Sequence, residues 1–182
     1  MRVCPCPLLL VGDKVVSEPK VLACVNAEHG FNENQAVLSE AENLAGTSKK
    51  LLALYCWKFY GDEFMSEYVN EATRRRYVEE AEQNYRGIFN RFVAKHDLTA
   101  FGEGVRFENG DPAQLIPDFC RTESVDVVVL SSASQNHPLH LLLGSTVEAI
   151  LDEIPCSLLV VKALGFKSPV KLIRSRVEIG NA

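Results

Sequence analysis

The sequence predicts an α/β fold in which an open five-stranded parallel sheet carries helices on both faces. Short apolar runs, typical of strands buried on both faces, alternate along the chain with longer amphipathic segments. Turn-forming residues, such as Gly46 and the run Gly110-Asp111-Pro112, separate these segments. The 182 residues suffice for one domain with a proper core and are too few for two ordinary domains.

The expected strands are the apolar runs at residues 21–25, 51–57, 104–107, 125–130 and 156–161. The run at 125–130 gives the strongest signal, because it is rich in β-branched residues and almost free of charge. With one helix between each pair of strands, the predicted order is β-α-β-α-β-α-β-α-β.

The helix after the first strand is expected to run to about Ala45, with Asn32 or Asn34 as its N-cap and Gly46 as its stop. Residues 66–96 are expected to form an amphipathic helix whose apolar stripe is Val78, Ala81, Tyr85, Ile88 and Phe92. The remaining helices are expected after Gly110-Asp111-Pro112 and after Gly144-Ser145, the second carrying Val147, Ile150, Leu151 and Ile154.

Charge and hydropathy argue against several classes of partner. The formal net charge of -5 gives no electrostatic footprint for DNA, RNA or an anionic membrane. The basic cluster at residues 74–76 lies beside Glu71, Glu79 and Glu80, which favours a salt-bridged helix face over a nucleic-acid contact. No apolar run approaches the ~18 residues of a membrane helix, and the first residues do not resemble a secretory signal. We expect a cytoplasmic protein with neither a membrane nor a nucleic-acid partner.

Six cysteines would by arithmetic allow three disulfides. Cys24, Cys56 and Cys156 lie in apolar runs, where free cysteine behaves as a small hydrophobe, so reduced, buried thiols are expected. Cys4-x-Cys6 lacks a second pair of ligands at zinc spacing, and we expect no metal site. As an alternative, Cys4 and Cys6 are the exposed thiols of a redox sensor.

Parallel α/β sheets bind ligands beyond the carboxyl ends of their strands, near the point where strand order reverses. The residues expected at this edge are Val25, Asn26, Cys56, Gly110, Leu130, Ser131 and Ser134. Gly144 would let a phosphate approach the next helix, where Ser145 and Thr146 add hydroxyl donors; alternatively, Ser145 only caps that helix. Neither a P-loop nor a G-x-S-x-G elbow is present, and we expect no catalytic residue.

Several motifs together resemble the carboxyl half of a universal stress protein domain. They are Gly110-Asp111-Pro112, the strand at 126–130, Leu141-Leu142-Leu143-Gly144-Ser145 and the run at 155–161. The resemblance covers about residues 20–163 and implies a Rossmann-like fold, often with an adenine nucleotide. It also implies a homodimer formed through the last strand, at Leu158, Leu159, Val160 and Val161.

The family's nucleotide signature is only half present. Ser131 and Ser134 stand at its first two glycine positions, whereas Gly144-Ser145 is intact. Asn26 replaces the aspartate that ATP-binding members carry near the adenosine, and Cys56-Trp57 is bulky where the family has a small aliphatic residue. The resemblance therefore implies a stress-response module with a degenerate nucleotide site, acting by dimerisation and through a protein partner. The alternative is a member that binds ATP with Mg and hydrolyses it slowly, using Gly144, Ser145 and Thr146.

A short apolar motif occurs twice, as Pro-Cys-Pro-Leu-Leu-Leu-Val at 5–11 and Pro-Cys-Ser-Leu-Leu-Val-Val at 155–161. We interpret residues 1–19 as the last strand and linker of a preceding domain, so that the chain resembles the second half of a tandem universal stress protein; a chance apolar start is the alternative. The domain itself would span 20–163, followed by an extension at 164–182. This interpretation predicts that Leu8 to Val11 lie antiparallel to Leu158 to Val161, of the same chain or a neighbour.

Overall fold

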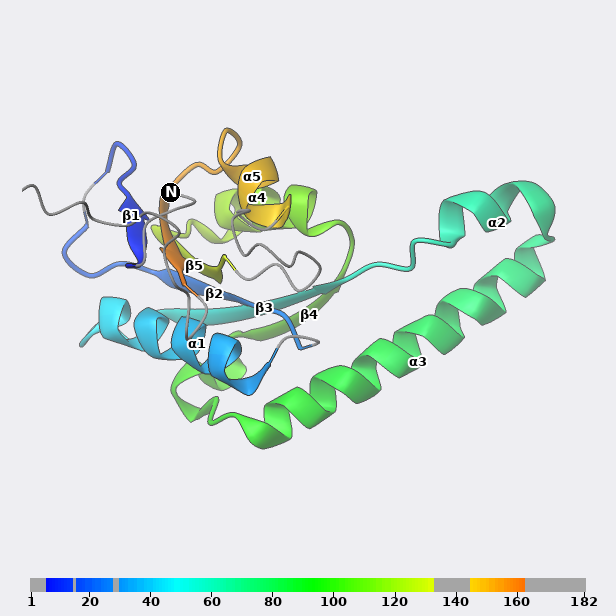
Figure 1. Cartoon of the computed structure of the whole chain (residues 1–182), viewed down its shortest axis with the longest axis horizontal. Helices are drawn as coiled ribbons and strands as arrows, with labels where there is room; N and C mark the ends of the chain where they lie inside the picture. The colour runs from blue at the N-terminus through cyan, green and yellow to red at the C-terminus, as the bar shows by residue number, and fades with distance from the viewer. Residues whose placement is uncertain (1–5, 15, 28–29, 133–144, 163–182) are drawn as a thin grey trace, which may run out of the picture.

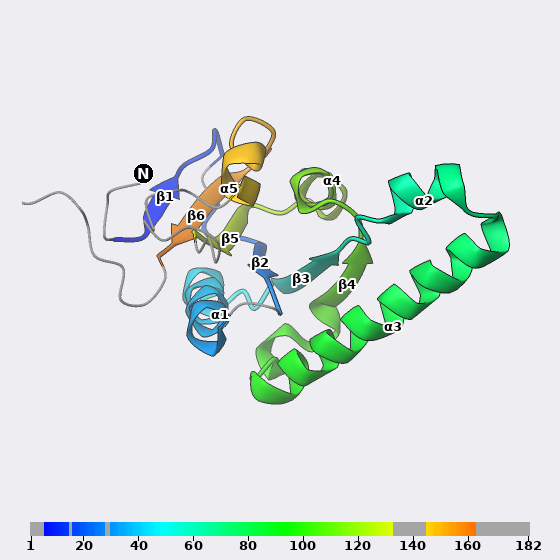
Figure 2. The ribbon, with the colours of Figure 1, turned by 45° about the vertical axis from the view of Figure 1, so that its right-hand side comes forward.

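In the computed structural model of the chain, residues 6–14, 16–27, 30–132 and 145–162 are described. Within them, one sheet contains six strands in the order β1-β6-β5-β2-β3-β4 (Figure 2). The strands are β1 (Leu8–Leu10), β2 (Val21–Val25), β3 (Leu51–Trp57), β4 (Val105–Asn109), β5 (Val127–Ser131) and β6 (Ser157–Val161). β2 to β6 pair in parallel, so the predicted five-stranded parallel sheet is confirmed, and β1 adds a sixth, antiparallel strand.

The helices cover both faces of this sheet (Figure 1). They are α1 (Phe31–Ala45), α2 (Asp62–Tyr68), α3 (Glu71–Lys95), α4 (Pro112–Glu123) and α5 (Ser145–Ile150), with a 3₁₀ segment at Thr99–Gly104. α1 and α3 lie on one face, and α4 and α5 on the other (Figure 2). This is the two-sided cover that the alternating pattern predicts.

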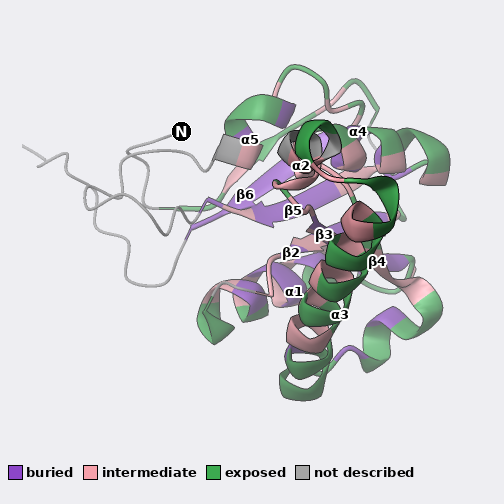
Figure 3. Ribbon diagram, turned by 90° about the vertical axis from the view of Figure 1, so that its right-hand side faces the viewer, coloured by how far each residue is buried: buried purple, intermediate pink, exposed green. Residues whose placement is uncertain are grey.

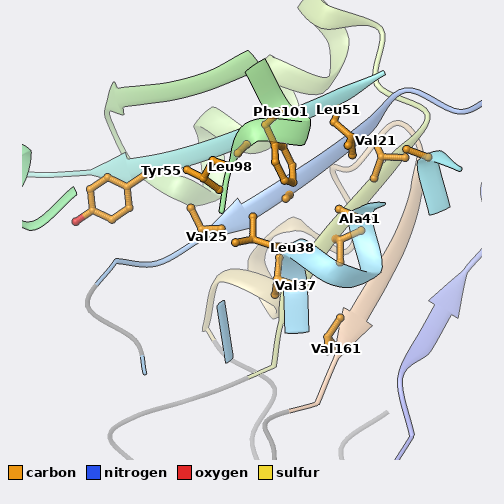
Figure 4. Packing of buried hydrophobic residues seen from close by; sticks show 14 of the residues in the cluster. Val21, Val25, Val37, Leu38, Ala41, Leu51, Tyr55, Leu98, Phe101 and Val161 are labelled. Atoms are coloured by element: carbon orange, nitrogen blue, oxygen red, sulfur yellow. The ribbon is translucent and has the colours of Figure 1, made fainter. Parts of the chain in front are cut away.

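Successive residues of a strand point to opposite faces of the sheet. Because helices cover both faces, both sets of side chains are apolar, and the strands are continuous apolar runs in the sequence. In β2, Val21 and Ala23 join the core beneath α1, whereas Leu22 joins the core beneath α4 and α5. All three are 0% exposed. Figure 3 shows the inner strands, such as β5 and β6, as mostly buried, whereas β4 at the edge is partly exposed. Figure 4 shows the α1-side core closing around Val21, Val25 and Leu38.

β1 pairs with β6 of its own chain, in the register Leu8↔Val160, Leu9↔Leu159 and Leu10↔Leu158. The predicted antiparallel pairing of the repeated motif is thereby confirmed. The backbone N–H of Gly12 then donates to Ser157 Oγ at 3.0 Å, which ties the following turn to the start of β6.

The predicted cap of α1 is wrong. Gly30 is the N-cap residue and makes no side-chain cap hydrogen bond. Asn32 lies exposed in the first turn, whereas Asn34 lies inside the helix with only 3% of its surface exposed. Asn34 instead holds the loop that leaves β2, through hydrogen bonds to the backbone of Asn26.

The helix expected at 66–96 is two helices, α2 and α3, which join at Asn70. Asn70 Oδ1 accepts from the Thr73 N–H at 2.9 Å and so caps α3. Arg74 binds both carboxylate oxygens of Asp62 at 2.7 Å, which fixes α2 against the first turn of α3. The predicted salt-bridged face is confirmed, with Asp62 as an additional partner.

The helix pair α2–α3 projects beyond the sheet (Figure 1). Ala81, Tyr85 and Phe92 of the predicted stripe pack on the α1-side core, but Phe92 is the only buried residue of this fully described helix. The first turns of α3 therefore depend on local ion pairs more than on core packing.

α5 ends at Ile150 instead of continuing through Ile154. The carbonyl of Ile150 accepts the N–H groups of both Glu153 and Ile154, which forms a turn. Ile154 precedes Pro155, and a residue before proline disfavours helical backbone angles. Val147 and Ile150 are nearly inaccessible and anchor this short helix on the sheet.

None of the helices in the described segments is both long enough and apolar enough to cross a membrane.

Candidate functional site

The carboxyl ends of β2 and β5 form the topological switch point of the sheet. These strands are neighbours, with β3 continuing on one side and β6 on the other. The connections after them leave in opposite directions, and ligands of doubly wound sheets bind at such points. Val25 and Leu130 are buried there, and Asn26 and Ser131, one position further along, are half-buried. The structure thus brings together these four residues that the sequence predicted for the site.

Asn34 braces the loop that leaves β2. Its Oδ1 accepts from the N–H of Asn26 at 3.1 Å, and its Nδ2 donates to the carbonyl of Asn26 at 2.8 Å. The same Nδ2 donates to the carbonyl of Gly30 at 3.4 Å. Both backbone groups of Asn26 are therefore bonded within the protein, and its side chain is a neutral carboxamide.

Ser131 is the last residue of β5 and pairs with Val161 of β6. The next N–H, of Ser132, still donates to the carbonyl of Val161 at 2.8 Å. The backbone at Ser131 is extended, and in the described chain the only non-glycine residues with positive φ are Lys49 and Ser124. Serine is therefore unstrained at this signature position, and its effect on a ligand comes from its side chain, whose hydroxyl can donate to a phosphate.

Cys56 and Trp57, at the end of β3, point to opposite faces of the sheet. The Trp57 ring lies against Tyr85 and Phe107, with centroid distances of 5.4 and 5.8 Å, and Trp57 is 4% exposed. The bulk of the indole is thus packed beneath α3. Cys56 packs on the α4 side, where burial, with Glu108 and Asp111 nearby, raises the pKa of its thiol to about 12.

Gly110 has a packing role at the rim. Its N–H donates to the carbonyl of Trp57 at 2.8 Å, and its φ of +157° lies in the positive range. A Cβ at this position would come within 2.8 Å of Leu115 Cδ1. Glycine therefore allows the first turn of α4 to approach the end of β3. This packing explains the glycine at position 110 without a ligand-binding role.

The phosphate side of the predicted site is only partly described. Thr146 is half-buried in the first turn of α5, and the Ser145 backbone begins that helix. Ser134 and Gly144, like Cys4 of the alternative redox hypothesis, lie outside the described residues.

The polar side chains that the sequence predicted for the switch point, and that the structure describes, are uncharged. Asn26, Ser131 and Thr146 can hydrogen-bond a polar ligand, but none of them can serve as a carboxylate base. Charged residues follow the strands at this edge. Lys162 comes directly after β6 and is 9% exposed, and Lys58, directly after β3, has its Nζ 3.7 Å from Oδ2 of Asp111. Among the described residues, no three His, Cys, Asp or Glu side chains are placed to hold a metal ion.

Sequence reasoning missed two contributors to this edge, Asn34 and the Lys58–Asp111 pair. From its local sequence Asn34 looks like a helix cap, because its hydrogen-bond partner Asn26 lies outside the helix. Asp111 did have a readable signal, since an aspartate directly before proline is a typical N-cap, and its Oδ1 accepts from the Ala113 N–H at 2.9 Å.

The predicted dimer edge is covered within the chain. Leu158, Leu159, Val160 and Val161 are all buried in β6. β1 pairs along the outer side of that strand, so the outermost apolar side chains of the sheet are Leu9 and Leu10, which are 50% and 38% exposed.

The sequence that forms this sheet matches one known protein family. Residues 19–162 match the model of the universal stress protein family. The chain belongs to the universal stress protein family. The expected family is thereby confirmed over the whole five-stranded unit.

Curated relatives include Universal stress protein E of Escherichia coli (strain K12), which is 26% identical over 186 residues. This match covers 94% of the present chain and 56% of the relative. Universal stress protein E of Photorhabdus laumondii is 23% identical with the same coverage. The chain thus spans a little over half the length of the curated relatives it matches.

Solved structures show the same fold. Universal stress protein UspA from Lactobacillus plantarum has a TM-score of 0.61 at 21% identity, covering 81% of this chain and 99% of that one. A functionally unknown protein from Pseudomonas aeruginosa PAO1 has a TM-score of 0.62 at 24% identity, covering 88% and 53%. At these identities, the likeness establishes the α/β architecture alone.

Proposed function

We propose that this universal stress protein is a non-catalytic stress-response module that acts by dimerisation and by binding a protein partner, with a degenerate nucleotide site. The observation that carries the proposal is the neutral, internally bonded strand end at Asn26. An aspartate there would offer a charge to an adenosine hydroxyl, whereas Asn26 offers an amide and has no free backbone group.

The titration of a fluorescent ATP analogue, with and without magnesium, tests the nucleotide part. We expect binding no tighter than about millimolar, equivalent to about 4 kcal/mol of binding free energy. The double variant Asn26→Asp, Ser131→Gly restores two signature residues at the switch point and serves as the matched control. It should bind at least about tenfold more tightly, a gain of about 1.4 kcal/mol. Sub-micromolar binding by the unmodified chain would contradict the proposal.

The alternative, slow ATP hydrolysis with Mg, is favoured by one observation. Ser131 is unstrained, and its hydroxyl lies at the switch point, where hydroxyl donors suit a phosphate. Tight, magnesium-dependent binding in the same titration, followed by release of phosphate, would establish this alternative.

The proposed dimer uses the β6 edge of the sheet. β1 already shows that this edge accepts an antiparallel strand, and Leu9 and Leu10 of β1, with Val11 directly after it, remain exposed. A second copy would either extend the sheet from β1 or replace β1 on β6.

Sedimentation across a range of concentrations tests this association. We expect a dimer that Leu9→Arg weakens, because this residue is half exposed on the outermost strand. The same change at Tyr68, an exposed apolar residue far from the edge, is the control. A monomer at all concentrations, or equal weakening by both variants, would contradict the proposed edge.

A further inference from the structure

A cavity of about 290 Å³ opens at the amino ends of β5 and β6, at the opposite end of the strands from the switch point. Its lining includes Cys120 from α4, Cys156 directly before β6, Arg121, Asp126, and the turn at Gly12 and Lys14. Cys120 is 1% exposed, whereas Cys156 is half-buried. Two thiols from segments far apart in the sequence therefore meet at a solvent-connected cavity.

The two thiols are in hydrogen-bond contact. Cys120 and the Val128 N–H both form hydrogen bonds with the Cys156 sulfur. These contacts hold the pKa of Cys156 below its ordinary value, against the opposing effects of burial and of Asp126. The same contact, together with burial, raises the pKa of Cys120. The pair thus combines an accessible thiol that ionises readily with a buried thiol that keeps its proton.

We propose that Cys120 and Cys156 are a redox-active pair that hydrogen peroxide converts into an intramolecular disulfide. The Cys156 thiolate attacks one peroxide oxygen, so that an S–O bond forms and the O–O bond breaks. The products are a sulfenic acid and one water. Cys120 then loses its proton and attacks the Cys156 sulfur, and the S–O oxygen leaves as a second water. In total, two thiols lose two electrons and one peroxide is reduced to two waters.

The location gives the disulfide a mechanical consequence. It would join α4 covalently to the residue that precedes β6, the strand that carries β1. A Cβ on Gly12 would lie 3.2 Å from the Cys156 carbonyl carbon, so the turn after β1 packs directly on this residue. Because both thiols line the same cavity and pack in the same core cluster, side-chain rotation can bring the two sulfurs to the disulfide bond length of about 2.05 Å.

Peptide mapping under non-reducing conditions tests the proposal. The reduced full-length chain is treated with hydrogen peroxide, alkylated, unfolded and digested with trypsin. Cleavage after Arg106, Arg121 and Lys162 leaves Cys120 and Cys156 as the single cysteines of peptides 107–121 and 122–162. We expect these peptides to be recovered as one species that separates on reduction. Their recovery as unlinked, alkylated peptides would overturn the proposal.

Two variants separate the roles of the thiols, with circular dichroism confirming the fold of each. Cys120→Ala should leave Cys156 as a sulfenic acid that dimedone labels, and Cys156→Ser should leave Cys120 unoxidised. Cys56→Ser is the matched control and should form the cross-link normally. In the unmodified chain, Cys156 should react with iodoacetamide at least about tenfold faster than Cys56, whose pKa is raised. Equal rates, or no dimedone adduct in folded Cys120→Ala, would contradict the assignment.

Discussion

Replacing Asn34 with alanine should destabilise the domain far more than an ordinary helix substitution. Asn34 is 3% exposed and makes hydrogen bonds of 3.1 and 2.8 Å with the backbone of Asn26, plus a longer one of 3.4 Å to Gly30. Each lost partner leaves a group whose desolvation costs about 1–3 kcal/mol. Two good bonds therefore predict a loss of about 2–4 kcal/mol in the free energy of unfolding, measured by urea titration.

Asn32→Ala is the matched control, because it removes the same side chain from an exposed position two residues earlier in the same helix. We expect its effect to lie within about 0.5 kcal/mol of zero. If both variants lose the same stability, the clamp between Asn34 and the β2 loop does not contribute as argued. A large loss for Asn32→Ala alone would instead restore the N-cap interpretation.

Three further predictions concern the core, the helix pair and the edge. Leu22→Ala, at a fully buried position, should lower the free energy of unfolding by about 2–5 kcal/mol in urea titrations; a change below about 1 kcal/mol would contradict its place in the core. Arg74 holds the pKa of Asp62 below its usual range, so the pair stabilises the fold above that range and ceases to do so as the pH falls through the lowered pKa. Asp62→Asn should therefore flatten the acid dependence of stability below about pH 4, where the unfolded chain binds the proton first, and an unchanged slope there would refute this. Ser157→Ala removes the acceptor of the Gly12 N–H, should cost about 1 kcal/mol and should speed hydrogen exchange in β1, whereas unchanged exchange would show that this bond does not hold the turn.

The strands could be predicted from the sequence because a strand buried on both faces requires a continuous apolar run, such as that of β2. The repeated motif also predicted the partner of β1, since the two runs have matching length and edge strands require pairing. Strand ends shifted by one or two residues, where hydrogen bonding and not hydropathy sets the boundary.

Features that depend on distant partners were not predictable in this way. An asparagine near a helix start gives the same local signal as a cap or as a clamp, and only the position of Asn26 distinguishes the two roles. The break between α2 and α3 depends on Arg74 reaching back twelve residues to Asp62, a spacing that no helical pattern contains. At the site, the positions of Cys56 and Trp57 were predictable, because successive side chains of a strand point to opposite faces of the sheet.

The two ends of the sheet are chemically different, and this bears on how the protein could respond to a signal. At the carboxyl end, the described side chains Asn26 and Ser131 are neutral, and Asn34 holds the backbone. At the amino end, the cavity that contains the thiol pair also contacts the turn after β1. A change at Cys156 therefore acts directly on the turn that follows β1. A ligand at the switch point acts on the other end of the same strand, because Ser131 pairs with Val161 and the neighbouring Val160 pairs with Leu8. Both ends of the sheet therefore have a direct route to its outer edge, the amino end through the turn at Gly12 and the carboxyl end through Leu8.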